Sequence, residues 1–506
     1  MQSRPTFSRR RLLGAAAVAG AAALGASTPR RARTQGRDDR RFLIVFGASG
    51  GASLLDSVLA VRASECPTPD TLNVFPDDAV QSIEGSPFRA VRWRATSVGA
   101  IPYGFEADQR PFVAKHAADL LAVTCTTSSV NHAVGQRRAV TGNEAFRGRT
   151  LQELVALTHG AGALLPNVHL STGTGFNEPG TDATLPAACY GEIVANPVLW
   201  PLTLHGSRGT PGAGRAGAIA EARRVRDERL DELSPFARLF RQSPALRAWR
   251  ELRGERLRAF EQGDWISQLT FLPDADASPL GRFGLASAPE AEQVRAAFPG
   301  YATDPLDAQA ALAFLLLKNR LSAAVTLGTS FEFGYDTAAA PGGLEGGNLP
   351  PGSVFNLPIG FDFSHDAHRA TQAFMWQRAL RVIDRLIDLL RGVAYGDGGS
   401  LWDRTLIYVA TDFGRTKSRP AGAAEFGSGH DLNNGALVLS PLVRGGRVLG
   451  GVDPATCLTY GFDLRTGAPD PNRQTSEAEL FAGLLGALGV DLTGSGLPDV
   501  PALRGA

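Results

Sequence analysis

Short, almost wholly apolar runs recur along the chain, and each is followed by a turn that contains Gly, Ser, Thr or Asp. Runs of this length and composition are typical of strands that are buried on both faces, as in a mostly parallel sheet. We therefore predict that five of these runs form a central sheet: 42–46, 120–123, 323–327, 406–410 and 436–439.

Helical patterns separate these apolar runs. Ser476 and Glu479 form a capping-box signature for a helix that runs to Leu488. Strands that alternate with helices predict a layered α/β fold. Three further segments have apolar positions at helical spacing: 150–157, 306–321 and 372–391.

An Arg-rich, amphipathic stretch at 216–262 carries no strand pattern. We predict that it is a helical insertion that covers the sheet or caps the site, and a helix that binds a partner is the alternative. Two long loops rich in Gly and Pro, at 206–214 and 338–352, are of the kind that compact domains use for function or leave mobile.

The first residues have the pattern of an export signal. Ser8-Arg9-Arg10-Arg11 precedes an Ala/Gly-rich apolar stretch that runs to Ala26. Paired arginines before a weakly apolar run favour the twin-arginine pathway. We predict a signal peptide at 1–32, a linker at 33–41 and one α/β domain at 42–506. The protein would then pass, already folded, through the twin-arginine translocase to the periplasm or to the outside of the cell.

Composition narrows the functional classes. The apolar stretch near the N-terminus is shorter than the roughly 20 residues that a spanning helix needs, and no longer one follows, so we expect no transmembrane segment in the mature chain. The formal net charge is +1 and charges of both signs are interspersed, so we expect no nucleic-acid partner. The four cysteines are far apart, which excludes a thiolate zinc site and leaves both disulfides and free buried thiols open.

Metal-capable side chains follow the apolar runs, and ligands of an open parallel sheet bind beyond the carboxyl ends of its strands. Asp412 comes directly after 406–410, His430 precedes 436–439, and Ser-His-Asp-Ala-His at 364–368 precedes the long helix. Carboxylates and imidazoles without thiolates suit zinc or manganese, whereas a carboxylate-rich position suits magnesium or calcium. The alternative is that the two aspartates of these motifs only cap a turn and a helix.

The order of these motifs resembles domain-of-unknown-function family 1501, a family of twin-arginine-exported proteins in the alkaline phosphatase and sulfatase-like superfamily. The resemblance rests on Asp-x-His before a long helix, on Thr-Asp-Phe-Gly-Arg-Thr at 411–416, and on Gly-x-x-His before a strand that continues into 443–448. Asn131-His132, followed by Thr141-Gly142, is similar to the Ser-His segment of that family. The resemblance spans nearly the whole mature chain and implies an alkaline-phosphatase-like three-layer fold.

The resemblance also implies a site with two metal ions. Asp366, His368 and His430 would hold one ion, and Asp412 would hold the second. Two cations a few ångströms apart would neutralise a phosphate or sulfate group and clamp the attacking and leaving oxygens. Arg415 would stabilise the equatorial oxygens of that group, or else it forms a structural ion pair.

Two positions depart from the family pattern. Asn131 stands where the family has Ser, and an amide cannot form a covalent phosphoryl or sulfuryl intermediate. Either water attacks the ester directly with the help of a metal ion, in a site that keeps His132, or the site is degenerate. Ser53 stands where an acidic ligand is expected, and Asp56, a turn further on, is the substitute ligand.

Three functional hypotheses follow from these patterns. The first is an exported metal-dependent hydrolase or transferase that acts on a small-molecule phosphate or sulfate ester. The second is an exported, non-catalytic binding or assembly protein with a degenerate metal site. The third is a Rossmann-type oxidoreductase, because the glycine-rich turn at 46–52 follows an apolar run. Against the third, Ser53 occupies the third glycine position, and no Tyr is followed by Lys four residues later.

Overall fold

The computed structural model describes residues 39–99, 104–170, 175–204, 213–226, 229, 233–240, 263–329, 334–335, 355–356, 360–396, 398–423 and 426–505. The predicted signal peptide, most of the predicted linker and a large part of the Arg-rich stretch lie outside the described residues. The chain divides into two compact units. The larger unit comprises Asp38–Thr181, Ala188–Pro197 and Val294–Ala506.

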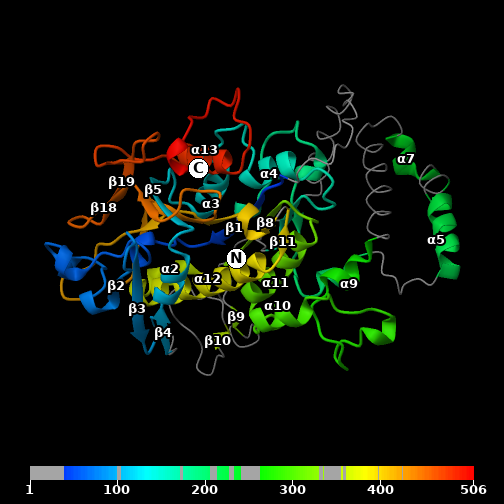
Figure 1. The fold of residues 1–506 in the computed structure, drawn as a ribbon, viewed down its shortest axis with the longest axis horizontal. Coiled ribbons are helices and arrows are strands. Elements are labelled where there is room, and N and C mark those ends of the chain that lie inside the picture. Colours follow the sequence, from blue (N-terminus) through cyan, green and yellow to red (C-terminus); the bar gives the residue numbers. More distant parts are fainter. Residues whose placement is uncertain are drawn as a thin grey trace, which may run out of the picture. The chain divides into compact units, whose positions relative to one another are not determined.

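An eight-stranded sheet forms the centre of the larger unit, in the order β17-β5-β16-β13-β1-β8-β6-β7 (Figure 1). The first strand of the chain, β1 (Phe42–Ala48), lies in the middle and pairs in parallel with β13 (Thr405–Thr411) and β8 (Ala324–Thr329). β16 (Asn433–Leu439) runs antiparallel to both of its neighbours, β13 and β5 (Leu120–Thr126). The remaining strands pair in parallel: β17 (Arg447–Leu449), β6 (Asn167–His169) and β7 (Glu192–Ile193).

Helices cover both faces of this sheet, which gives three layers (Figure 1). One face is covered by α3 (His132–Thr141), α4 (Leu151–His159) and α13 (Glu477–Ala487), and the other by α11 (Pro305–Lys318) and α12 (His368–Arg391). Leu43 and Val45 of β1 belong to the apolar core that contains side chains of α4 and α13. Because side chains alternate along a strand, Ile44 points to the opposite face. Both faces of the strand are therefore buried.

The α/β class and the mostly parallel central sheet predicted from the sequence are confirmed. All five apolar runs are strands of this one sheet. The helices predicted at 150–157, 306–321 and 372–391 correspond to α4, α11 and α12. The capping box before α13 is present, with Ser476 and Glu479 each accepting a hydrogen bond from the other's backbone amide.

Two three-stranded antiparallel sheets in the described residues accompany the central one and were not expected from the sequence. β2 (Val80–Ser82), β3 (Arg89–Ala95) and β4 (Phe105–Asp108) form one. β18 (Gly451–Asp453), β19 (Leu458–Phe462) and β20 (Pro469–Asp470) form the other. Their strands are short and partly exposed, so they lack the continuous apolar runs that mark the central strands.

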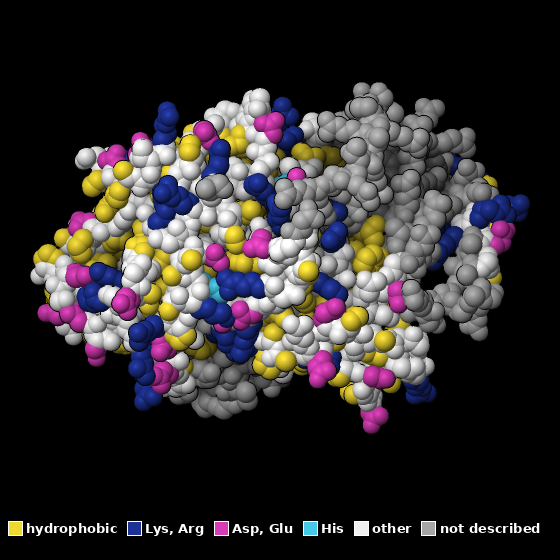
Figure 2. Space-filling view, viewed as in Figure 1, with side chains coloured by type: hydrophobic (Ala, Val, Ile, Leu, Met, Phe, Trp, Pro, Cys, Tyr) yellow, Lys and Arg dark blue, Asp and Glu magenta, His cyan; other side chains and the backbone are white. Residues whose placement is uncertain are grey.

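The smaller unit includes the part of the predicted insertion that the structure describes. Its helices are α5 (Ala213–Val225), α7 (Pro235–Leu239) and α9 (Trp265–Leu269). Within the described ranges, no helix combines the length and the apolar character that crossing a bilayer requires. On the face shown in Figure 2, acidic and basic side chains are intermixed, in keeping with the balanced composition.

Candidate metal centre

The candidate site lies beyond the carboxyl ends of the central strands. The loop after β1 supplies Gly50 and Gly51, and Asp412 follows β13 directly. His132 is the first residue of α3, which begins shortly after β5. His430 starts β15 (His430–Asp431), which pairs with β14 (Gly414–Arg415). Parallel strands thus bring segments that are far apart in the sequence to one edge of the sheet, as an open α/β sheet does at its ligand-binding edge.

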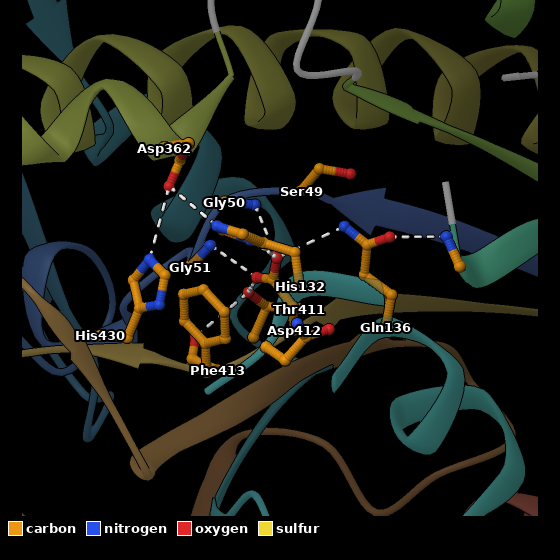
Figure 3. A network of polar contacts seen from close by, with 12 residues as sticks. Ser49, Gly50, Gly51, His132, Gln136, Asp362, Thr411, Asp412, Phe413 and His430 are labelled. Carbon is orange, nitrogen blue, oxygen red and sulfur yellow. Dashed lines mark hydrogen bonds and ion pairs between the residues drawn. The ribbon is translucent and has the colours of Figure 1, made fainter. Parts of the chain in front are cut away.

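Asp412 is the fully buried centre of this arrangement (Figure 3). Its Oδ2 accepts a hydrogen bond of 3.0 Å from Gly50 N, and its Oδ1 accepts one of 2.6 Å from Gly51 N. Both glycines have positive φ, +98° and +82°, which residues with a side chain rarely adopt. A Cβ at position 50 would also lie 2.1 Å from Asp362 N. The two amides therefore bind a carboxylate of the protein itself, which leaves them unavailable to the pyrophosphate of a dinucleotide.

The Nε2 atoms of His132 and His430 point toward the same place because the Nδ1 atom of each ring has a hydrogen-bonding partner on the other side. His132 Nδ1 lies 2.7 Å from Asp412 Oδ2, and His430 Nδ1 lies 2.8 Å from Val130 O. A carboxylate or carbonyl at Nδ1 fixes the proton there and leaves a lone pair on Nε2. The ring of Phe413 stacks on His430, with centroids 4.0 Å apart, and fixes its plane.

Asp362 faces these nitrogen atoms from the opposite side (Figure 3). It lies in the short helix η10 (Phe361–His365), just before α12. Its Oδ1 is 3.3 Å from His132 Nε2 and 3.8 Å from His430 Nε2. One turn later, His365 Nε2 lies 3.4 Å from the same oxygen and 2.9 Å from His430 Nε2. Two imidazole nitrogens and one carboxylate oxygen therefore converge, and His365 borders this group of three without belonging to it.

These separations fit one small divalent cation. Metal–ligand bonds of about 2.0–2.1 Å in a tetrahedron place neighbouring ligand atoms about 3.3 Å apart. Asp362 Oδ1 lies 3.3 Å from His132 Nε2 and 3.8 Å from His430 Nε2. The ligand atoms of His132, Asp362 and His430 all lie within 4.8 Å of one another.

The close approach of these groups shifts the pKa values of His132 and Asp362. Burial opposes the charged form of His132, but hydrogen bonds to Asp362 and Asp412 outweigh it and raise the pKa of His132 to about 9. Burial also opposes the charge on Asp362, yet hydrogen bonds from the three histidines and the charge of Arg415 hold the pKa of Asp362 well below its usual range. A metal ion would replace the His132 proton.

Arg415 lies beside the cluster and holds it together. Its NH2 group donates to Asp362 Oδ1 at 2.5 Å and to Gly50 O at 2.5 Å, and its NH1 group donates to Ser428 O at 3.2 Å. The guanidinium is buried and its donors are directed at the protein. This geometry matches the structural ion pair, one of the two roles that the sequence left open for Arg415.

Asp56 and His368, two of the ligands expected from the sequence, form a separate buried cluster with Lys417. His368 Nε2 lies 3.1 Å from both carboxylate oxygens of Asp56, and Lys417 Nζ donates to the same carboxylate. Lys417 Nζ is also 3.1 Å from His368 Nε2, and His368 Nδ1 contacts Ser428 Oγ at 2.8 Å. The lysine ammonium therefore occupies the position between Asp56 and His368 where a cation would bind.

Three of the sequence-predicted residues, His132, Asp412 and His430, are brought together at the centre. Asp366 is exposed and lies outside the group that could hold an ion. Asn131 is the N-cap of α3, where its side chain accepts a hydrogen bond from Val134 N at 3.2 Å. Asp362 was missed by sequence reasoning. Its signal was the spacing to His365, since residues three apart face the same way in a helical turn.

Comparisons with known proteins give no family. No protein-family model matches the sequence, and no curated protein matches it. Among solved structures, Ps i-CgsB in complex with k-i-k-neocarrahexaose aligns at 8% identity and a TM-score of 0.30, over 91% of this chain and 75% of that one. The phosphonate monoester hydrolase SpPMH from Silicibacter pomeroyi aligns at 13% identity and a TM-score of 0.31, over 92% and 75% of the two chains. At TM-scores this low, these likenesses support neither a family nor a function.

Proposed function

We propose that the chain is a metal-dependent hydrolase or transferase that acts on a phosphate or sulfate ester, on an alkaline-phosphatase-like fold similar to that of family 1501. The observation that carries the proposal is the convergence of His132 Nε2, His430 Nε2 and Asp362 Oδ1, with His365 beside them. Imidazoles and a carboxylate without thiolates suit zinc or manganese. A bound cation of this kind supplies a Lewis acid for an ester oxygen and lowers the pKa of water.

Three residues around that cation would have different roles. Asp412 keeps the proton of His132 on Nδ1, so that Nε2 remains a ligand. Arg415 holds the Asp362 carboxylate in place and balances its charge. His365 is almost half exposed, at 46% of its side chain, so solvent and a small substrate can reach that side of the cluster.

We infer one metal ion where the sequence resemblance implies two. Asp56 and His368 are already matched by the Lys417 ammonium, whose charge would oppose a second cation. A fixed positive charge in this position stabilises the buried carboxylate without a metal.

Elemental analysis of the purified mature protein tests the metal centre. We expect about one equivalent of zinc or manganese in the wild type, and a loss of most of it in His430→Ala and in Asp362→Ala. His159→Gln is the matched control, because His159 contacts Leu488 O away from the site. Protein that binds no metal after purification or after titration with zinc and manganese would rule out the site.

Activity is tested next with a panel of phosphate and sulfate monoesters. Turnover that requires the metal and disappears in Asp362→Ala supports the proposal. Turnover that persists unchanged in this variant would place the chemistry elsewhere.

The second candidate is a non-catalytic binding or assembly protein that keeps the metal. The side chain of Asn131 is engaged as a helix cap and offers no hydroxyl nucleophile, which favours this candidate. Metal-loaded protein that binds inorganic phosphate or sulfate in calorimetry, yet turns over no ester in the panel, would support it.

We also propose export through the twin-arginine translocase to the periplasm or the outside of the cell, from the Arg9-Arg10 pair and the apolar stretch after it. Replacing both arginines by lysine should retain the protein in the cytoplasm. A variant that is exported as efficiently as the wild type would argue for another route.

A further inference from the structure

Two of the four cysteines lie together in a small apolar cluster of the larger unit. Cys66 and Cys457 are both buried there, beside Leu55, Val61 and Val74. Both side chains therefore pack in the same cluster, and both thiols are free in the structure. The other two cysteines are apart from this cluster: Cys125 lies on β5, and Cys189 ends the short helix η6 (Ala187–Cys189).

We propose that Cys66 and Cys457 form a disulfide bond when the protein folds under oxidising conditions. One thiol loses its proton and attacks a small-molecule or protein disulfide; one half of that disulfide leaves as a thiol, and the other half stays bound in a mixed disulfide. The second cysteine then displaces the other half of the oxidant from the mixed disulfide. The two cysteines lose two electrons and two protons in total, and the oxidant disulfide gains them as two thiols.

The backbone at each cysteine is hydrogen-bonded. The Cys66 amide donates to Ala63 O at 3.1 Å. Cys457 lies in the turn between β18 and β19, where its amide donates to Asp453 O at 2.8 Å. A disulfide requires the two Cα atoms to lie about 4.4–6.8 Å apart, so the bond demands that these two segments pack directly against each other, as their shared cluster indicates.

Burial determines when the bond can form. It raises the pKa of the Cys66 thiol, and it raises the pKa of the Cys457 thiol to about 12. The reactive thiolate is therefore scarce in the folded protein. Oxidation is expected while the cluster is still open, during folding or partial unfolding, and the closed cluster then protects the disulfide from reductants.

The disulfide would reinforce the buried ion cluster next to it. Leu55 packs in the cysteine cluster and directly precedes Asp56, the partner of Lys417. A bond between residues 66 and 457 would fasten the loop that carries Asp56 to the β18–β19 hairpin. It would also close a long loop in the unfolded chain, which lowers the entropy of that state.

Thiol counting on the mature chain tests the proposal. The protein is incubated in sub-denaturing urea with oxidised glutathione, and free thiols are counted under full denaturation. We expect four thiols before treatment and two after it, with one linked peptide that contains Cys66 and Cys457. Cys125→Ser/Cys189→Ser should lose both of its thiols, whereas Cys66→Ala should keep Cys457 from pairing within the chain. The oxidised wild type should unfold at a higher urea concentration than the reduced protein.

Four free thiols after oxidation would overturn the proposal, and so would a linked peptide that joins other cysteines. Mass spectrometry separates an internal bond from capture of glutathione, which adds mass and also counts against the proposal. These readings use the wild type, so they hold even if a variant fails to fold. They do not depend on the metal centre.

Discussion

Asp412 is fully enclosed by protein groups, and three groups of the site depend on it for their positions. Two backbone amides and the Nδ1 atom of His132 all direct hydrogens at its carboxylate. Partners of this kind behind a ligating imidazole typically change metal affinity by 10–100-fold when they are lost. The residue thus influences the metal through His132.

We therefore expect Asp412→Asn to weaken metal binding by about 10–100-fold, because an amide cannot keep the His132 proton on Nδ1 as a carboxylate does. Competition with a chromophoric chelator measures the affinity. Asp366→Asn is the matched control and should leave the affinity unchanged, since Asp366 is exposed and outside the cluster. An equal loss in both variants would restore Asp366 as a ligand.

The ammonium of Lys417 is the counter-ion of a fully buried carboxylate. Lys417→Met would leave the buried Asp56 carboxylate with the imidazole of His368 as its partner, and removing one member of a buried ion pair costs about 3–5 kcal/mol. Urea unfolding measures the loss. The double variant Lys417→Met/Asp56→Asn removes both charges and should recover part of the stability. A single variant as stable as the wild type would mean that His368 alone compensates the charge of Asp56.

Helix α3 carries His132 and approaches the end of β13 closely because residue 135 is glycine. A Cβ at this position would lie 2.4 Å from Asp412 O. Gly135→Ala should push the helix away from the strand and weaken metal binding, measured with the same chelator. Ala133→Gly, on the exposed side of the helix, is the control for helix propensity and should leave the affinity near that of the wild type.

Strand β6 contains a buried histidine, His169, that should make the stability of the protein depend on pH. Burial lowers the pKa of His169 to about 4, below the value of about 6.5 in an unfolded chain. Between these values the unfolded chain binds a proton that the folded chain does not, so stability falls as the pH drops from 6.5 to 4. We expect a loss of about 3 kcal/mol from this group. His169→Asn should flatten that part of the stability–pH curve, and an unchanged curve would show that another group causes it.

Elements with continuous apolar runs were predictable from the sequence, whereas geometry between elements was not. The runs that form β1, β5, β8, β13 and β16 are buried on both faces, so their composition alone marks them. The short, half-exposed strands β2 and β18 lack that signal. Asp412 and His430 stood out because they flank such runs.

The partners of the candidate ligands needed the structure. His368 begins α12 with its side chain buried beside Lys417, a residue that no sequence pattern connects to it. Asp366, two positions earlier, is exposed although both fit the same motif. Which of several nearby carboxylates faces the site depends on the path of η10, and that path is set by contacts such as Phe361 N with Ser49 O.

For the whole molecule, the metal should act as a stabilising ligand. It would join η10, α3 and β15, so binding to the folded state alone should raise the unfolding free energy by about 2.7 kcal/mol at a free concentration 100 times Kd. A chelator should lower the melting temperature of the wild type and leave that of Asp362→Ala unchanged. An equal response of both proteins would mean that the chelator acts elsewhere.

The central place of β1 in the sheet has a consequence for biosynthesis. Gly50, just after β1, is bonded to Asp412, 362 positions later. At about 5–20 residues per second, a ribosome needs roughly 20–70 s to cover that distance. For most of this time the apolar β1 lacks its neighbour β8 (Ala324–Thr329), and until the end of it β1 lacks β13 (Thr405–Thr411), so the strand is exposed to aggregation or to chaperones. The ligand cluster can assemble only after His430 has been synthesised, so a correctly formed metal centre would report that the segments on both sides of β1 have reached their places.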